Sequence, residues 1–389
     1  MSADPIFLSE KCDSGVPNLD ALRADAEAHA HARTALIRKR HPHLTPEEQA
    51  WELLTLSRYR RGPKALTETA KERSLAQIRE TVRRDLELTF TLCFLPAKIR
   101  HPLKTFARDG TEVDMGEAGA ILRLHELATG LSDLLHRPAR ATVSSDGMRY
   151  AHCMGVTSQT VRGYQRNVRL LIEALGVQNT VTIVDEATLL PLTWSDDVAA
   201  ETVRVRNQIA AGDEATVTEV TKLQPAVALC IDVDPSTSLS DLILAHAEDL
   251  SRDERRSKHP SAADLREELE LRGLEATIGY VAANRAMARI QLFRHCWPLT
   301  LKGTVHPKPG EIGLLPVNEA TDNVFPYHGQ GHSRLGVPIR DKVDDIRVSF
   351  VIDLLRLEQV DRLRGIMLPP DQFPFSNGLH PFGIIAKDG

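Results

Sequence analysis

The first quarter of the chain changes from a helical to an extended pattern of hydrophobic positions. Over residues 18–88 apolar side chains recur at three- and four-residue spacing, which predicts helices. Thr45 and Pro46 mark one helix start, because threonine accepts hydrogen bonds at an N-cap and proline suits the first turn. Residues 86–96 then form a short apolar run with β-branched and aromatic side chains, which is typical of a buried strand.

The next part of the chain predicts a strand–helix–strand unit. Residues 114–137 are strongly periodic and predict a helix. Residues 139–145 and 180–185 have the pattern of strands, and the helical pattern of residues 157–176 lies between them and ends at a glycine. Two strands joined in this way by a helix favour a parallel sheet.

The pattern of residues changes twice in the second half of the chain. Residues 191–275 are polar, acidic and mostly helical in pattern, and residues 279–297 predict a further helix. Beyond them, short strand-like runs are separated by proline and glycine. The sequence therefore predicts an α/β protein in four parts. These are an N-terminal arm with helices (1–88), an α/β core (89–190), a helical insertion or lid (191–278), and a β-rich C-terminal part that completes the site (279–389).

Composition narrows the class of protein. The chain has 389 residues, 42% of them hydrophobic, so it can form a sizeable core, and its net charge of −5 argues against a protein that coats nucleic acid. The five cysteines are odd in number and no two have metal-ligand spacing. The chain begins without a signal-peptide pattern and has no apolar run of the ~18–20 residues that a membrane helix needs. We expect a cytoplasmic protein that binds neither nucleic acid nor membrane.

Common catalytic fingerprints are absent from the sequence, including the G-x-G-x-x-G, Walker A, G-x-S-x-G and H-E-x-x-H motifs. One candidate is the aperiodic segment 97–114, which follows a predicted strand and carries Lys98, Arg100 and Lys104. These cations are suited to clamp a phosphate or a carboxylate. The alternative is a solvated basic loop.

A second candidate follows the predicted strand 139–145. Ser145 and Asp146 stand where that strand ends, and the carboxyl edge of a parallel sheet is where such proteins bind ligands. Asp146 would act as a base or hold an amine or hydroxyl group, and Gly147 would let the backbone turn sharply or approach a ligand closely. The alternative is an Asx or ST turn. Glu117, three residues after Asp114, is either a helix cap or a part of the site.

Histidines form a third candidate. His306, His328 and His332 lie in the C-terminal part, and glycines around the last two indicate a loop rather than a helix. Acid–base work or a phosphate contact suits His306 and His328, and a metal site or a purely structural role remains an alternative. Arg285 interrupts an apolar helical pattern, as either a surface side chain or a buried anion anchor.

Eight segments in order resemble one family. They are LLTLSRYRRGP, FLPAKIRHPLKT, VDMGEAGAILRL, SSDGMRYAHCMGVTSQTVRGY, ANRAMARIQLF, GTVHPKPGEIGLLPV, FPYHG and HPFGIIAKDG, and they span residues 53–389. This series resembles the isocyanide (isonitrile) synthases, also described as pyoverdine/dityrosine biosynthesis proteins. The order of the series is more specific than any one segment.

The resemblance implies a Rossmann-like fold with additional elements and no bound nucleotide. It implies conversion of an amino acid's α-amino group to an isonitrile, with C2 of ribulose 5-phosphate as the carbon source and no metal or organic cofactor. Lys98, Arg100, Lys104 and Arg285 would then be phosphate contacts, and Asp146, Glu117, His306 and His328 would be acids and bases. An iron(II)/2-oxoglutarate oxygenase is the expected downstream enzyme.

Two departures from the family pattern keep other functions open. This chain has His152 where the family usually has an acidic residue, and Tyr327 where it usually has tryptophan. One alternative is a diverged cofactor-free lyase or transferase that joins an amine to another sugar phosphate or ketone. A non-catalytic homologue that binds small molecules is the other.

Overall fold

A computed structural model describes the N-terminal helices, the sheet and the long helical segment of the chain. The described residues are 19–56, 67–93, 110–290 without 229, 232, 235 and 248, 300–304, 312–314, 318–319 and the strands between 335 and 386. In these residues no helix is long and apolar enough to cross a membrane.

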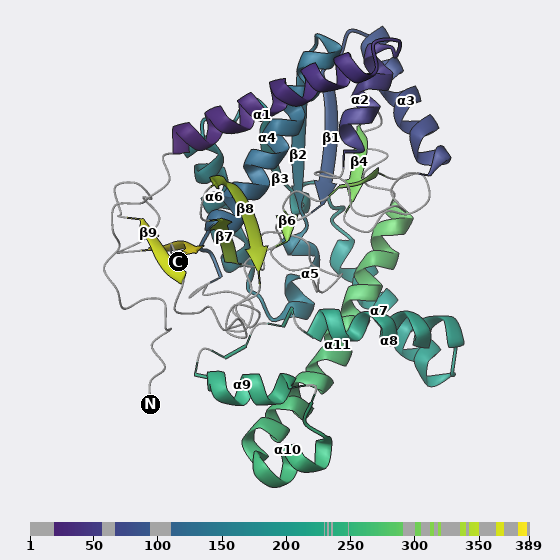
Figure 1. Ribbon diagram of the computed structural model, residues 1–389. Coiled ribbons are helices and arrows are strands. Elements are labelled where there is room, and N and C mark those ends of the chain that lie inside the picture. The colour runs from purple at the N-terminus through teal and green to yellow at the C-terminus, as the bar shows by residue number, and fades with distance from the viewer. Residues whose placement is uncertain are drawn as a thin grey trace.

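A five-stranded parallel sheet lies at the centre of the molecule (Figure 1). Its order is β3 (Val181–Asp185), β2 (Ala139–Ser145), β1 (Leu88–Cys93), β4 (Leu301–Thr304) and β5 (Ile312–Gly313). The predicted parallel α/β core is therefore confirmed. The chain adds strands outward from β1 to β3 and returns to the other side of β1 with β4, which is the order of a Rossmann-like sheet. The prediction missed that β4 and β5, from the β-rich part, complete this sheet.

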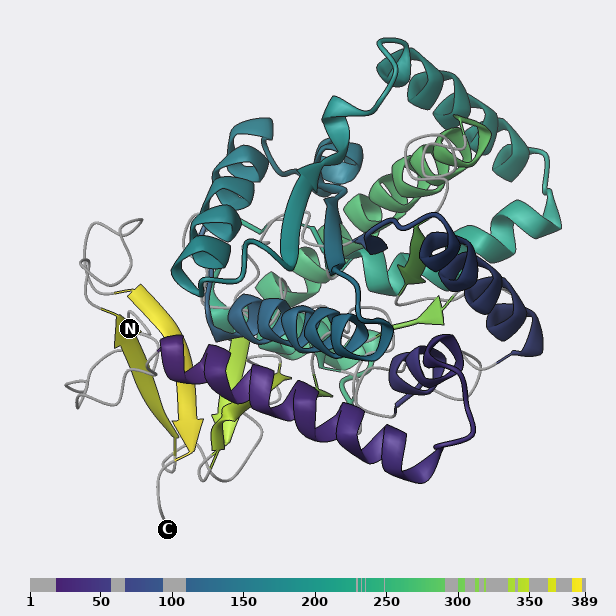
Figure 2. The same ribbon diagram turned by 90° about the horizontal axis from the view of Figure 1, so that it is seen from above.

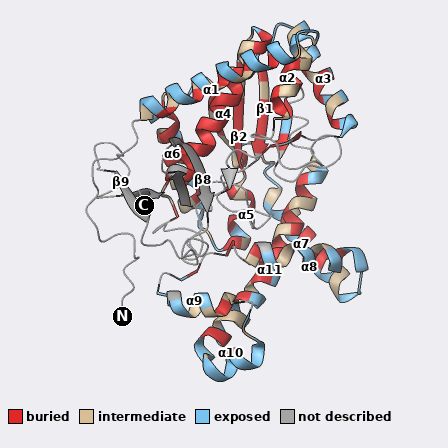
Figure 3. Cartoon of the chain, in the orientation of Figure 1, coloured by how far each residue is buried: buried red, intermediate tan, exposed pale blue. Residues whose placement is uncertain are grey.

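Helices cover the sheet and pack with it to form the hydrophobic core. Strand β1 leads to α4 (Met115–Leu135), and strand β2 leads through α6 (Ser158–Ala174) to β3. Helix α1 (Leu19–Arg40) lies along α4 on the side away from the strands (Figure 2). Helix α4 is buried along most of its length between these two layers, as Figure 3 shows in red. The N-terminal part continues with α2 (Pro46–Leu54) and α3 (Glu68–Arg83), and Thr45 caps α2 as predicted.

A short helix after β2 was not predicted. Helix α5 (Gly147–Met154) begins directly after Asp146, whose backbone has φ −91° and ψ 11°. Gly147 is the first helical residue, so the chain turns from strand to helix at Asp146, and Gly147 itself is not left-handed. The left-handed glycine is Gly155, with φ 76°, which ends the helix.

The segment predicted as a helical insertion is helical in the structure, and it forms a lobe below and to the right of the sheet in Figure 1. The long helix α11 joins this lobe to α5 through a second apolar cluster that includes Tyr150, Met154 and Ala283. The prediction divided this helix, because it placed residues up to 275 in the mostly helical segment and began a separate helix at residue 279. The elements after β3 are η2 (Glu186–Thr188), α7 (Trp194–Ala210), α8 (Glu214–Ala228), α9 (Leu239–His246), α10 (Arg252–Lys258) and α11 (Pro260–Ile290).

The described C-terminal residues are mainly strands, in agreement with the predicted β-rich part. Strands β6 (Asn318–Glu319) and β7 (Leu335–Ile339) flank β8 (Lys342–Ser349) in one small sheet. Strands β9 (Leu363–Leu368) and β10 (His380–Ala386) form an antiparallel pair.

Candidate active site

The carboxyl edge of the parallel sheet gathers the polar residues that follow β2 and β3. Ser144 and Ser145 end β2, and Asp185 and Glu186 stand where β3 ends. The predicted phosphate contacts Lys98, Arg100 and Lys104 follow β1 in the sequence, and His306 follows β4; these four and His328 lie outside the described residues. Among the described residues, the candidate site therefore consists of residues at the ends of β2 and β3.

Asp146 carries a carboxyl group that is incompletely hydrogen-bonded at this edge. It is the N-cap residue of α5, yet its side chain makes no capping hydrogen bond. Its Oδ1 atom is shielded from solvent and has no hydrogen-bond partner among the described residues. The alternative prediction for this aspartate is an Asx turn, in which a side-chain oxygen accepts a hydrogen bond from the backbone. Burial raises the pKa of Asp146, and the nearby Arg149 guanidinium opposes that rise.

Glu186 and Arg149 form a buried ion pair beside Asp146. The guanidinium of Arg149 contacts the Glu186 carboxylate, and both side chains are almost completely buried. The Ser144 hydroxyl donates a hydrogen bond of 3.1 Å to Glu186 Oε1. Burial raises the pKa of Glu186 to about 7; Arg149 and Ser144 favour its anion, and the negative charge of Asp146 opposes it. The two carboxyl groups therefore titrate as a pair.

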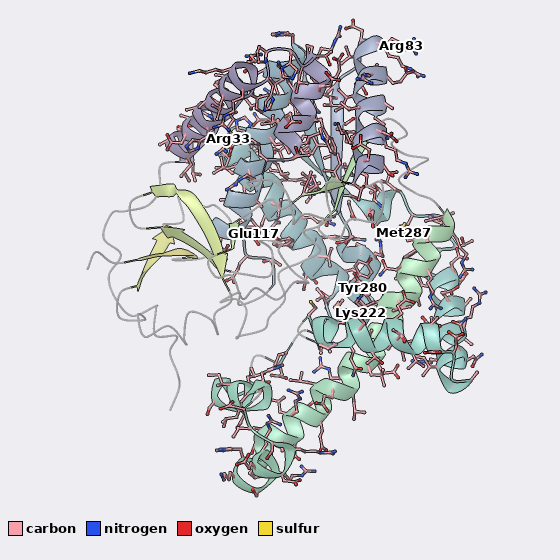
Figure 4. All side chains as sticks on the ribbon, turned by 45° about the vertical axis from the view of Figure 1, so that its right-hand side comes forward. Arg33, Arg83, Glu117, Lys222, Tyr280 and Met287 are labelled. Atoms are coloured by element: carbon pink, nitrogen blue, oxygen red, sulfur yellow. The ribbon has the colours of Figure 1, made fainter. Side chains whose placement is uncertain are left out.

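Two tyrosines connect this ion pair to α11. Arg149 Nη1 donates to the hydroxyl oxygen of Tyr150 (3.1 Å), and that hydroxyl donates to Asn284 Oδ1 (2.6 Å). The ring of Tyr150 stacks on Tyr280 with centroids 4.5 Å apart, and Figure 4 shows Tyr280 on the long helix. Burial raises the pKa of both tyrosines, so they remain protonated at neutral pH. Helix α11 thereby orients α5, which carries the charged groups.

The structure gives Glu117 the role of a helix cap. Its Oε2 atom accepts a hydrogen bond from the Asp114 amide (2.7 Å), which closes the capping box, and its Oε1 atom accepts one from the Tyr164 hydroxyl (2.9 Å). The side chain is fully buried at the first turn of α4, where it is labelled in Figure 4. Ser145 is also fully buried, and its hydroxyl accepts a hydrogen bond from Gln165 of α6 (3.0 Å).

Arg285 lies on a different face of α11 from Asn284, whose side chain accepts the hydrogen bond from Tyr150. Its guanidinium donates to Gln208 Oε1 (2.7 Å) and Thr216 Oγ1 (3.1 Å), and pairs with Glu219 (2.7 Å). These partners belong to α7 and α8, so Arg285 links helices of the lobe. The structure does not bring it together with Asp146, and its role in phosphate binding stays a prediction.

The sequence match identifies the family of this fold and site. A profile described as "Pyoverdine/dityrosine biosynthesis protein" matches residues 78–272, which is half of the chain and includes the ends of β1, β2 and β3. The chain belongs to the pyoverdine/dityrosine biosynthesis protein family. The resemblance inferred from the ordered segments is therefore confirmed.

A solved structure has the same fold. The chain is similar to the PvcA protein from Pseudomonas aeruginosa, with a TM-score of 0.60 and 15% sequence identity. The similarity covers 88% of this chain and 100% of that one. A comparison with curated protein sequences finds no match. At this identity the structural likeness shows the fold alone.

Sequence reasoning missed five residues of this candidate site. Glu186 had the same signal as Asp146, because it directly follows a predicted strand of the parallel sheet. Arg149 and Tyr150 lie on the short helix that was not predicted, so nothing indicated which way they face. Tyr280 and Asn284 are distant in sequence, and their contacts depend on how α11 crosses α5.

A cleft of about 370 Å³ lies next to this cluster, between α5, α7 and α11. His152, Cys153, Arg206, Arg272 and Glu275 are among its lining residues. Burial lowers the pKa of His152, which favours the neutral imidazole, and raises the pKa of the Cys153 thiol to about 12, which makes it a poor nucleophile at neutral pH. No group of three potential metal ligands occurs in the part of the chain that the structure describes.

Proposed function

We propose that this protein is an isonitrile synthase. It would convert the α-amino group of an amino acid to an isonitrile in the biosynthesis of a specialised metabolite, with ribulose 5-phosphate as the carbon donor. Family membership and the PvcA-like fold support a biosynthetic role of this type. The single observation that supports this chemistry is Asp146, whose Oδ1 atom is shielded from solvent and has no hydrogen-bond partner among the described residues, at the edge where parallel sheets bind ligands.

The proposed reaction needs groups that transfer protons, and carboxyl groups at this edge of the sheet are suited to do so. An amine that adds to a ketone forms an imine only if protons are moved at the nitrogen and at the departing oxygen, and such transfers need a carboxyl group or imidazole held in place. Burial raises the pKa of both Asp146 and Glu186, and that of Glu186 reaches about 7, which suits proton transfer near neutral pH. His306 and His328 are further acid–base candidates.

The sugar phosphate requires positive charge. Lys98, Arg100 and Lys104 are our candidates, because they follow β1, whose carboxyl end borders the point where the strand order reverses. Ser145 is a weaker candidate, since its hydroxyl already accepts a hydrogen bond from Gln165. The proposed reaction involves no metal or organic cofactor, and an iron(II)/2-oxoglutarate oxygenase would act on the product.

The test is direct detection of the product. The purified protein is incubated with ribulose 5-phosphate and pools of the twenty amino acids, and a tetrazine trap reports isonitriles by mass spectrometry. Label at C2 of ribulose should appear in the isonitrile carbon. Asp146→Ala and Lys104→Ala should abolish the product while the far-ultraviolet circular dichroism is unchanged. Full activity in both variants would contradict the proposed site. If no pool gave a trapped isonitrile, the proposed reaction would be contradicted for the standard amino acids.

His152 is the observation that favours a second candidate. A neutral imidazole lines the cleft beside α5 at a position where the family usually has an acidic side chain. A change of charge there is consistent with a diverged cofactor-free lyase or transferase that joins an amine to another sugar phosphate or ketone. The same incubations separate the two functions by product mass, because only an isonitrile reacts with the tetrazine.

A further inference from the structure

The carboxyl edge of the sheet holds more acidic than basic groups among the described residues. Asp146 and Glu186 are both near the single guanidinium of Arg149, and Glu186 is completely buried. If both carboxyl groups were ionised, one negative charge would remain without a described counter-charge beside the fully buried Glu186 and the solvent-shielded Oδ1 atom of Asp146. Burying an unpaired charge is costly, so a group in this position gains a proton instead.

Geometry decides which carboxyl group holds this proton. Glu186 receives the Arg149 guanidinium and the Ser144 hydroxyl, and both contacts stabilise its anion. The Asp146 anion is favoured less, because its Oδ1 atom has no hydrogen-bond partner and only the charge of Arg149 and its own backbone amide act in its favour. The proton therefore resides on Asp146, and Glu186 remains the partner of Arg149.

The other groups around the pair do not change this charge balance. Helix α5 contributes Tyr150, and α11 contributes Tyr280 and Asn284, all of which are uncharged at neutral pH. Strand β2 contributes the hydroxyls of Ser144 and Ser145. Arg149 is thus the cation among the described residues that faces both carboxyl groups.

We propose that Asp146 is the general acid of imine formation, and that Glu186, which engages the Arg149 guanidinium, is the positioning residue that keeps Asp146 protonated. In the carbinolamine formed by the amine and the ketone, the C–O bond breaks and the hydroxyl leaves as water with the Asp146 proton. The remaining N–H proton returns to the Asp146 carboxylate as the C=N bond forms. No net proton or electron is consumed. The assignment of this step rests on the proposed function, whereas the shared proton exists without substrate.

The shared proton is measured on the full-length protein without substrate. Infrared difference spectra, recorded as the pH is raised, follow the carbonyl stretch of protonated carboxyl groups. We expect one such group to lose its proton far above the ordinary aspartate pKa of about 3.9. Asp146→Asn should remove this signal. A signal that persists unchanged in Asp146→Asn, or its absence in the unmodified protein, would overturn the proposal.

Glu186→Gln tests the coupling between the two carboxyl groups. This change removes the neighbouring negative charge and leaves Arg149 to pair with Asp146, so the midpoint should fall by about one to three pH units. Glu126→Gln is the matched control, because Glu126 is a buried glutamate paired with Arg33 on the α1 side of α4. The control should leave the midpoint where it is. An unchanged midpoint in Glu186→Gln would refute the coupling.

Two further measurements complete the test. If Glu186→Gln fails to fold, Ser144→Ala removes only the hydroxyl donor to Glu186 and should move the midpoint to higher pH; no shift would refute the pair. With substrates, kcat should fall as the pH rises through the same midpoint, and this alkaline limb should move to lower pH in Glu186→Gln. Normal spectra without isonitrile formation would refute the proposed function and the acid role but not the shared proton.

Discussion

A single glycine controls how closely α5 approaches α11. A Cβ atom placed on Gly279 would lie 2.8 Å from the Cβ atom of Cys153. Real Cβ atoms do not approach so closely, and the atom it meets is fixed to the backbone of α5, so Gly279→Ala must push the two helices apart. The displaced helix carries Arg149 and Tyr150, and Tyr150 donates its hydrogen bond to Asn284 on α11.

The effect on stability should be small. Overpacking a buried contact costs about 1–3 kcal/mol, whereas alanine is better than glycine in a helix by about 1 kcal/mol. The free energy of unfolding should therefore fall by about 0–2 kcal/mol. Activity is more sensitive, because a misplacement of about 1 Å can reduce a rate on the order of 100-fold. A shift of α5 by a fraction of that distance should lower kcat roughly tenfold.

Gly273→Ala provides the matched control on the same helix. There the new Cβ atom would lie 2.9 Å from the Cβ atom of Ala228 at the end of α8, away from α5. Urea unfolding should report similar stability losses in the two variants. Isonitrile formation and the carboxyl titration midpoint should change only in Gly279→Ala. Equal activities and equal midpoints in the two variants would refute the idea that the α5–α11 contact positions the site.

Two further predictions concern buried polar groups. Tyr164→Phe removes a hydroxyl donor from the fully buried Glu117, so urea unfolding should show a loss of about 1–3 kcal/mol; an unchanged midpoint would contradict this. Burial lowers the pKa of His125, which contacts Thr180 and Glu27. The unfolded chain then binds the proton more readily, so the free energy of unfolding should fall as the pH drops below about 6.5, by up to about 1.4 kcal/mol per pH unit. His125→Gln should lose this contribution, and identical pH slopes would refute it.

Local patterns predicted most of the core. The helix after Asp114, the strand before Asp146 and the helix that ends before Gly176 follow from periodicity and caps, because these signals act within a few residues. Helix α5 was missed, since eight residues are too few to show a helical period. The pairing of β4 with β1 joins residues more than two hundred positions apart, and no local pattern encodes such a contact.

Some residues of the candidate site could likewise be predicted from local sequence, and others could not. Asp146 could be predicted because it directly follows a strand of a parallel sheet, and the edge of that sheet is a general property of the fold. Its interaction with Arg149 and Glu186 depends on the direction of α5 and on the turn after β3. Residue type left two roles open for Arg285, because a guanidinium within an apolar helix suits an anion site as well as it suits its contacts in the structure, Gln208, Thr216 and Glu219.

Two aspartates occupy N-cap positions of helices in this fold and should respond oppositely to the same change. Asp114 caps α4, where its Oδ1 atom accepts a hydrogen bond from the Gly116 amide (2.7 Å), so Asp114→Ala should cost about 0.5–2 kcal/mol in urea unfolding. Asp146 caps α5 in position only, without a side-chain hydrogen bond.

Asp146→Ala therefore removes no capping bond and should leave the free energy of unfolding nearly unchanged at acidic pH. Since the folded pKa of Asp146 is raised, its ionisation destabilises the native state as the pH rises. The alanine variant should accordingly become more stable than the unmodified protein above neutral pH, while product formation is lost. Equal losses of stability in Asp114→Ala and Asp146→Ala would mean that Asp146 is an ordinary cap. The opposite responses would mean that the fold tolerates an unfavourable carboxyl group at this edge because the chemistry requires it.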